Sequence, residues 1–301
     1  ICTAQVLLAI ISGMYAVYHG PKGLKEIGKR IHFLTSLLAS SLEKHGYKMI
    51  HDTFFDTICF KAHDWESKAK DSKLNFRNFE DGIVGISLDE TTTLEDIKKI
   101  LGIFNASLDQ SHEDKLPNDL LRSTSYLEHP IFNSYQSETK MLRYIHTLES
   151  KDLSLNTSMI PLGSCTMKLN STTEMEAVTW SEYANIHPFS PQEQTKGYSL
   201  LFEELGDQLI HLTGFDAISL QPNSGAQGEY AGLMIIRAYH LDRGNQNRNI
   251  CLIPSSAHGT NPASAIMAGM KVVVVECDQH GNIDEKDFKN KVDEHKESLA
   301  A

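Results

Sequence analysis

The chain has 301 residues, of which 41% are hydrophobic, and a formal net charge of −11 at pH 7. This length supports a large core divided between two domains, and the acidic balance with scattered Lys and Arg residues argues against nucleic-acid binding. The longest apolar run, residues 6–11, is too short to span a bilayer, and five cysteines without CxxC or zinc spacing predict no metal centre.

The two ends of the sequence do not resemble natural termini. Ile1 lies inside an apolar helical pattern without an initiator Met, and Ala301 follows soon after another helical pattern. We therefore expect an internal part of a longer protein. The low cysteine content indicates a reducing compartment and fits both a bacterial cytoplasm and a mitochondrial matrix.

Residues 1–105 carry the pattern of a small α+β domain. Helices are expected where apolar residues recur at helical spacing, over residues 2–18, 24–45 and 93–103. Gly20 and Pro21 separate the first two helices, since neither residue continues a helix well. Aromatic and β-branched residues favour strands over residues 53–60 and 82–88.

Residues 106–197 differ in composition from the segments on either side. The stretch 105–118 is polar and acidic, as in a linker. The remainder is rich in aromatic residues, Pro and Ser, with one clear helical pattern over residues 139–148. We interpret residues 106–197 as a linker and an arm that packs across other domains and contributes to an active site.

From residue 198 onwards, helical and strand patterns alternate. Apolar strands are expected over residues 217–220, 249–253 and 271–276. Helices are expected over residues 200–212, 230–239 and 285–295, with a further helix after His258. The alternation predicts an α/β fold whose sheet is largely parallel and connected by helical crossovers.

The first of two polar turns in this region joins a strand to a helix at Ser224, Gly225 and Ala226. Unpaired backbone N–H groups at the start of a helix, with a nearby hydroxyl, suit a phosphate. Gln227 follows in the same turn and is a weaker candidate for supporting the phosphate or an adjacent loop. A simple tight turn is the alternative interpretation.

The second polar turn places His258 just past the end of a strand, followed by Thr260. A planar imidazole there suits stacking on a cofactor ring. We expect the Thr260 hydroxyl either to face the substrate or to support the site from behind the imidazole. Both turns lie where an α/β sheet binds phosphorylated cofactors, so we expect such a cofactor at this edge.

Six stretches form long motifs of low degeneracy. They are residues 1–5, 15–21, 158–170, 187–189, 220–232 and 257–265. These motifs resemble the glycine decarboxylases, the pyridoxal-phosphate (PLP) P-proteins of the glycine cleavage system. The resemblance covers essentially the whole chain and identifies it as an internal segment, from the end of that family's first half to the start of its second half.

The resemblance implies the type I PLP-dependent transferase fold, which both halves of that family share, although only the second half binds the cofactor. Residues 1–105 would be the small α+β domain of the cofactor-free first half. Residues 106–197 would be the linker and arm, and residues 198–301 the start of the PLP-binding large domain with a mostly parallel sheet.

The same resemblance implies an activity. The family decarboxylates glycine and transfers the remaining aminomethyl group to the lipoyl arm of the H-protein, with PLP as the electron sink. Glycine and lipoylated H-protein are thus the expected partners, and the intact protein is expected to be a homo-oligomer. The Schiff-base Lys and the Asp that pairs with the ring nitrogen would lie beyond Ala301, so residues 1–301 alone are expected to be inactive.

In the arm, the resemblance places Ser164, Cys165 and Thr166, together with His187, on the substrate side. Covalent catalysis by Cys165 is not expected, because no His–acid pair can be assigned to it. His187 has the alternative of a purely structural turn. Lys168 precedes the phosphate turn, whereas the Schiff-base Lys of type I enzymes follows the core strands, so we expect Lys168 to be structural or to face an anion.

Two arm positions depart from the family pattern. Gln136 stands where the family usually has His, and Lys140 where it has Glu. Two other functions also stay open. One is a non-catalytic paralogue or scaffold half that keeps the fold without a cofactor. The other is a PLP-dependent decarboxylase of another amino acid, without the lipoyl partner.

Overall fold

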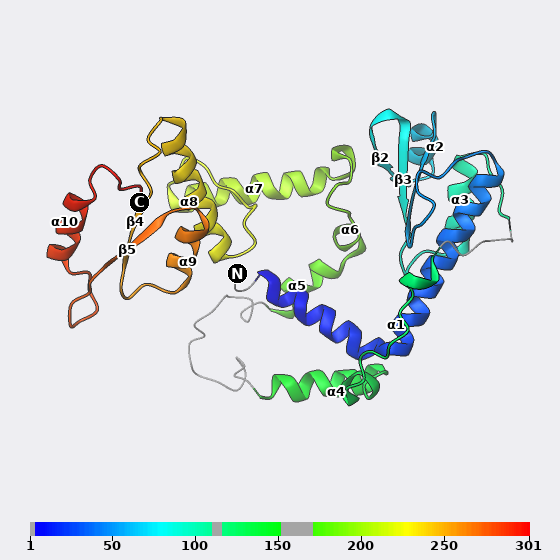
Figure 1. Cartoon of the computed structure of the whole chain (residues 1–301), viewed down its shortest axis with the longest axis horizontal. Helices are drawn as coiled ribbons and strands as arrows, with labels where there is room; N and C mark the ends of the chain where they lie inside the picture. Colours follow the sequence, from blue (N-terminus) through cyan, green and yellow to red (C-terminus); the bar gives the residue numbers. More distant parts are fainter. Residues whose placement is uncertain (1–3, 110–115, 152–170) are drawn as a thin grey trace. The chain divides into compact units, whose positions relative to one another are not determined.

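The computed structural model describes residues 4–109, 116–151 and 171–301. Contacts divide the chain into two compact units, one formed by Ser12–Pro161 and the other by Ile1–Ile11 with Leu162–Ala301. Figure 1 shows the elements of both units, which are described separately below.

Helix α1 (Ala4–Lys44) covers both helices predicted at the start of the chain. Gly20 interrupts it with φ 63° and ψ 179°, a conformation that essentially only glycine adopts, and Pro21 follows. The predicted break is therefore confirmed. An added Cβ at Gly20 would collide with Gln136 Nε2 and lie 2.5 Å from the Phe132 carbonyl oxygen, while Tyr126 donates a 2.6 Å hydrogen bond to the Pro21 carbonyl.

A three-stranded antiparallel sheet follows, in the order β1 (Thr57–Lys61), β3 (Ile83–Ser87), β2 (Arg77–Asn78). The strand predicted over residues 53–60 begins four residues later than expected. The Phe55 carbonyl, which precedes β1, accepts a 3.0 Å hydrogen bond from the His32 ring instead of from a strand. The two-residue β2 was not predicted, because both its side chains are exposed and carry no apolar pattern.

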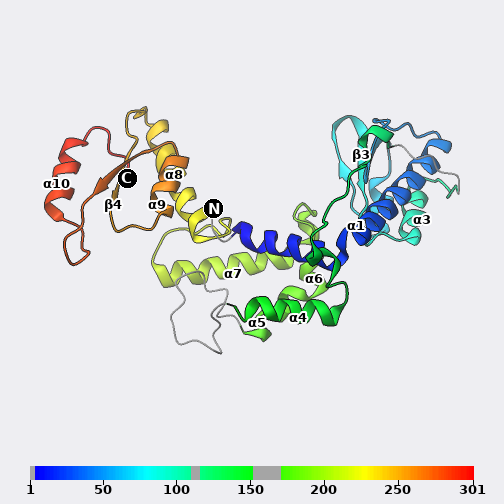
Figure 2. The same cartoon turned by 60° about the horizontal axis from the view of Figure 1, so that its bottom comes forward.

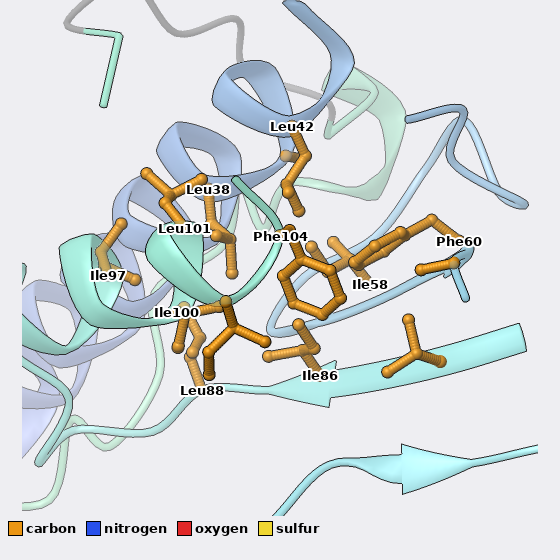
Figure 3. Close-up of a cluster of buried hydrophobic side chains, with 14 of the residues drawn as sticks. Leu38, Leu42, Ile58, Phe60, Ile86, Leu88, Ile97, Ile100, Leu101 and Phe104 are labelled. Atoms are coloured by element: carbon orange, nitrogen blue, oxygen red, sulfur yellow. The ribbon is translucent and has the colours of Figure 1, made fainter. Parts of the chain in front are cut away.

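Helices α1 and α3 (Leu94–Ile103) supply one side of a continuous core, and β1 and β3 supply the other (Figure 3). Its buried members include Leu38, Leu42, Ile58, Phe60, Val84, Ile86, Ile97, Leu101 and Phe104. A capping box between Thr93 and Asp96 begins α3. Together with the short helix α2 (Glu66–Asp71), these elements confirm the α+β character expected of the first 105 residues.

Short elements dominate the described parts of residues 106–197. Turns of 3₁₀ helix at Asn118–Leu120 and Pro130–Asn133 precede α4 (Glu138–Glu149), which confirms the helix predicted over residues 139–148. After the second gap come α5 (Thr172–Glu176), α6 (Ser181–Ala184) and 3₁₀ turns at Ala177–Thr179 and Gln192–Gln194.

The last hundred residues alternate helices and strands as predicted. The elements are α7 (Lys196–Thr213), α8 (Gly225–Asp242), β4 (Ile250–Pro254), α9 (Thr260–Met267), β5 (Lys271–Val275) and α10 (Glu285–Glu294). Strands β4 and β5 pair in parallel, with Ile250 opposite Lys271, which confirms an α/β fold with a parallel sheet. Leu299 forms a further parallel bridge to Ile250. Within the described ranges, no helix has an apolar stretch long enough to cross a membrane.

The prediction of a strand over residues 217–220 is wrong. This stretch has no regular secondary structure, and Ile218 and Leu220 are 41% and 39% exposed. A strand forms only when a neighbour pairs with its N–H and C=O groups, and no segment of residues 171–301 pairs with this one. Local apolar character therefore did not suffice to form a strand.

Helices α8 and α9 lie side by side next to the parallel strands in both views (Figures 1 and 2). A small core beneath them contains Cys251, Ile253, Ala265 and Met270, with Leu233 and Ile236 of α8 packed against it. The two polar turns singled out in the sequence both lead into these helices, Ser224 into α8 and His258 into α9. Both turns thus lead into helices that pack against each other.

Candidate functional site

Ser224 caps the first helix of the candidate site. Its backbone is extended, and its Oγ accepts a hydrogen bond from the N–H of Gln227 at 3.4 Å. The Ser224 carbonyl accepts from the N–H of Gly228 at 2.9 Å. A helix leaves its first N–H groups without partners inside the helix, so the N–H groups of Gly225 and Ala226 are available to an anion. The backbone donor of Gln227 is already used, which weakens its candidacy.

The start of α8 has the space that an anion needs. A Cβ added at Gly225 would meet no atom of the described residues within 4 Å, so that part of the chain leaves open the space directly beside this residue. The helix that follows has 18 residues, and its macrodipole favours negative charge at this end. Two N–H groups without partners inside the helix, the open space beside Gly225 and a favourable dipole together fit a phosphate group.

The second turn fixes the His258 ring through Thr260. The backbone N–H of Thr260 donates to His258 Nδ1 at 3.2 Å, and Thr260 Oγ1 lies 2.8 Å from the same atom. Because an N–H group only donates, Nδ1 acts as an acceptor and Nε2 carries the proton of the neutral ring. Thr260 is buried at 9% exposure, whereas His258 is exposed, so the ring is held at one edge and accessible elsewhere.

Two residues link these turns that the sequence did not single out. Asn261 Nδ2 donates to Glu229 Oε1 at 3.1 Å, and the backbone N–H of Asn261 donates to the His258 carbonyl at 3.0 Å. Both side chains are partly buried. No local pattern in the sequence marks these two residues, because their contact forms only where α8 and α9 pack together.

A cavity of about 920 Å³ lies beside the Ser224 turn. Its lining includes His187 and Tyr198, together with the irregular residues 218–221 and Asn223. His187 Nδ1 accepts a 3.1 Å hydrogen bond from the N–H of Phe189, which fixes the His-Pro-Phe turn locally. The structure therefore brings His187 into the same cavity as the residue that precedes Ser224.

A second cavity, of about 620 Å³, lies between α8 and β4. Its lining is mostly apolar, with Leu233, Ile236, Ile253 and Cys251, and Glu229 contributes its carboxylate. Burial raises the pKa of the Cys251 thiol, so this cysteine stays protonated and serves as a core residue.

The remaining arm candidates, Ser164, Cys165, Thr166 and Lys168, lie outside the described residues. Of the two departures from the family pattern, Gln136 covers Gly20 and donates a 3.2 Å hydrogen bond to the Phe132 carbonyl, so its position is structural. Lys140 lies in α4 and is exposed. Across the three described ranges, no group of three or more His, Cys, Asp or Glu side chains is arranged to hold a metal ion.

Comparison with known proteins gives a consistent result. Residues 1–104 match the family model described as glycine cleavage system P-protein. Over its whole length, the chain is 55% identical to a glycine dehydrogenase (decarboxylating) of Thermosynechococcus vestitus and 53% identical to one of Nostoc punctiforme. It is 52% identical to the mitochondrial glycine dehydrogenase (decarboxylating) of Pisum sativum. The chain spans about a third of each relative, 32%, 33% and 30% of their lengths respectively.

Proposed function

We propose that this chain, which belongs to the glycine cleavage system P-protein family, supplies the phosphate cradle and the ring-stacking residue of a PLP-dependent glycine decarboxylase. The observation that carries the proposal is the identity of more than half of all positions, over 100% of the chain, to proteins named glycine dehydrogenase (decarboxylating). The geometry of the Ser224 and His258 turns supports the proposal independently of the names of these relatives.

The proposed reaction is the decarboxylation of glycine, with transfer of the remaining aminomethyl group to the lipoyl arm of the H-protein. Glycine and lipoylated H-protein are the proposed partners, within a homo-oligomer. When bound, PLP would accept the negative charge that loss of CO₂ leaves on the substrate carbon. The relatives include bacterial proteins and a mitochondrial one, which supports a bacterial cytoplasm or a mitochondrial matrix as the site of action.

The proposed fold is the type I PLP-dependent transferase fold. Two features support it. Strands β4 and β5 form a parallel pair, and each of the two polar turns leads into a helix, α8 or α9. In this proposal, residues 1–105 form the small domain of the cofactor-free first half and residues 106–197 the linker and arm. Residues 198–301 then begin the PLP-binding large domain.

Each site residue has a defined task in this proposal. The N–H groups of Gly225 and Ala226 bind the phosphate, and Ser224 holds their helix in place through its cap on Gln227. The His258 ring orients the cofactor by stacking. Thr260 fixes the edge of that ring through the 2.8 Å contact at Nδ1.

The arm supplies the substrate side. His187 lines the 920 Å³ cavity, as Asn223 does, and is proposed to face the substrate there. Ser164, Cys165 and Thr166 are proposed to line the same side. Their role is to shape the site and exclude water, since no covalent step on the protein is required.

The test is an exchange assay with the full-length protein. Purified enzyme, PLP and lipoylated H-protein are incubated with glycine and labelled bicarbonate, and label entering the carboxyl group of glycine is counted. We expect exchange that depends on both PLP and H-protein. Absence of PLP binding would instead support a non-catalytic paralogue. CO₂ release from another amino acid without H-protein would support a different decarboxylase.

A further inference from the structure

The phosphate turn and the His258 turn begin two different helices, α8 and α9, so their relative position must be fixed by contacts between those helices. A phosphate held by one turn and a ring stacked at the other would belong to a single rigid cofactor. A shift of about 1 Å between the two turns would therefore misalign the ring even with the phosphate in place. Whatever connects the turns controls that alignment.

Asn261 makes this connection through two hydrogen bonds. Its backbone N–H donates to the His258 carbonyl at 3.0 Å, and its side-chain amide donates to Glu229 Oε1 at 3.1 Å. Glu229 lies in α8 one turn beyond the cap at Ser224. The connection thus runs from the His258 backbone through Asn261 to the first turns of the phosphate-side helix, joining side chains that are 32 positions apart.

The chemistry of this pair goes beyond helix packing. Glu229 Oε2 is buried and has no hydrogen-bond partner among the described residues, and the cavity beside Glu229 is mostly apolar. Burying a carboxylate that is only half satisfied costs free energy, which an apolar pair in the same place would avoid. A directional hydrogen bond, by contrast, sets one relative position of two helices.

We propose that Glu229 and Asn261 are positioning residues, which lock the ring-stacking turn to the phosphate turn. The inference rests on the proposed PLP site and adds residues that act on it indirectly. Neither side chain needs to touch the cofactor. Their effect is transmitted through the backbone of His258 on one side and the start of α8 on the other.

The experiment reverses the polarity of the hydrogen bond in the full-length protein. Asn261→Asp places two carboxylates against each other and breaks the bond. Glu229→Gln retains an acceptor for Asn261. The double variant Glu229→Gln with Asn261→Asp restores the bond with donor and acceptor exchanged. Three readouts are measured: the Kd of PLP, the circular dichroism band of bound PLP, and hydrogen exchange of residues 225–230 and 258–263 in the PLP-free protein.

We expect Asn261→Asp to raise the Kd of PLP about tenfold, the equivalent of one hydrogen bond to a charged group. It should also change the dichroism band and speed exchange in both segments. The double variant should return to within about twofold of the wild type, because coupled partners are not additive. Glu285→Gln, which removes the charge of an exposed pair with Lys289 in α10, is the matched control and should change none of these readouts.

Two results would overturn the inference. One is wild-type exchange and PLP affinity in Asn261→Asp, and the other is a double variant as impaired as that single variant. Exchange in β4 and β5, within the same unit as both variants, reports whether that unit is folded. If the wild type itself does not bind PLP, the proposed function fails. Exchange in the PLP-free protein then still decides whether Glu229 and Asn261 lock the two turns.

Discussion

At the scale of single residues, the Ser224 turn separates two effects that the sequence alone could not. The Ser224 side chain is occupied with capping α8, whereas the anion would be bound by the backbone of Gly225 and Ala226. A change at Ser224 should therefore act mainly on stability, and a change at Gly225 mainly on cofactor binding.

This separation is tested with Ser224→Ala and Gly225→Val. Loss of the cap should destabilise the helix by about 1 kcal/mol with a small effect on the Kd of PLP. A Cβ at position 225 meets none of the described residues within 4 Å, so we expect valine there to leave the melting temperature near that of the wild type while obstructing the phosphate. The expected rise in Kd is about tenfold or more, from the loss of roughly one charged hydrogen bond. Equal PLP affinity in the two variants would contradict the assignment.

The His258 ring is predicted to act by stacking. His258→Ala should weaken PLP binding about three- to tenfold, the range of an aromatic contact, and should slow glycine exchange. His258→Phe should recover most of the binding, because it keeps a ring although it loses the bond to Thr260. His211→Ala, at an exposed position in α7, is the control. His240 of α8 does not serve as this control, because its Nε2 lies 3.3 Å from the Ala300 carbonyl and its loss would disturb that contact. Unaltered PLP binding in His258→Ala would refute the stacking role.

At the scale of elements, regular patterns predicted the fold well wherever the signal was local. The helical spacing of apolar residues located α1, α3, α4, α7, α8 and α10, and the break at Gly20 followed from glycine and proline. The short helices α2, α5 and α6 were missed, and among the strands the failures were those whose existence depends on distant partners. Residues 217–220 are apolar but unpaired, and β2 is paired through the backbone of two exposed residues.

The break in α1 gives a prediction about stability. Gly20→Ala should destabilise the Ser12–Pro161 unit by about 2–3 kcal/mol, because alanine is strained at this φ and ψ and its Cβ meets the Phe132 carbonyl at 2.5 Å. Gly13→Ala, in the same helix with nothing within 4 Å of the new Cβ, should be neutral or slightly stabilising. Thermal unfolding of the full-length protein compares the two. A similar melting temperature for both variants would show that the break is not constrained.

The start of α3 gives a prediction about pH. Two hydrogen bonds from Thr93 lower the pKa of Asp96. The bond from its side chain has the larger effect, and the bond from its backbone N–H has the smaller one. Because its pKa is lower in the folded state, ionised Asp96 stabilises the fold at every pH above the usual pKa of an aspartate, near 4. This stabilisation is lost as the pH falls below that value and through the pKa that Asp96 has in the folded protein. Asp96→Asn should therefore reduce stability by about 0.5 kcal/mol at pH 7, and the difference should shrink below about pH 4. A difference that grows on acidification would contradict this cause.

At the scale of the whole molecule, the candidate site could be predicted in part. Motif position alone singled out Ser224, Gly225, Ala226 and His258 as candidates, because each lies where a polar turn leads into a helix. It could not identify Glu229 and Asn261, whose importance arises only when α8 and α9 pack together. Thr260 was expected to place its hydroxyl on the substrate side or behind the ring, and in the structure this hydroxyl lies 2.8 Å from His258 Nδ1.

The central claim is that one rigid cofactor joins the two turns. The most direct measurement is a crystal structure of the full-length protein with PLP bound. We predict the phosphate within hydrogen-bond distance of the N–H groups of Gly225 and Ala226, and the His258 ring stacked on the pyridine face. A PLP molecule whose phosphate is held elsewhere, or whose ring lies away from His258, would contradict the account.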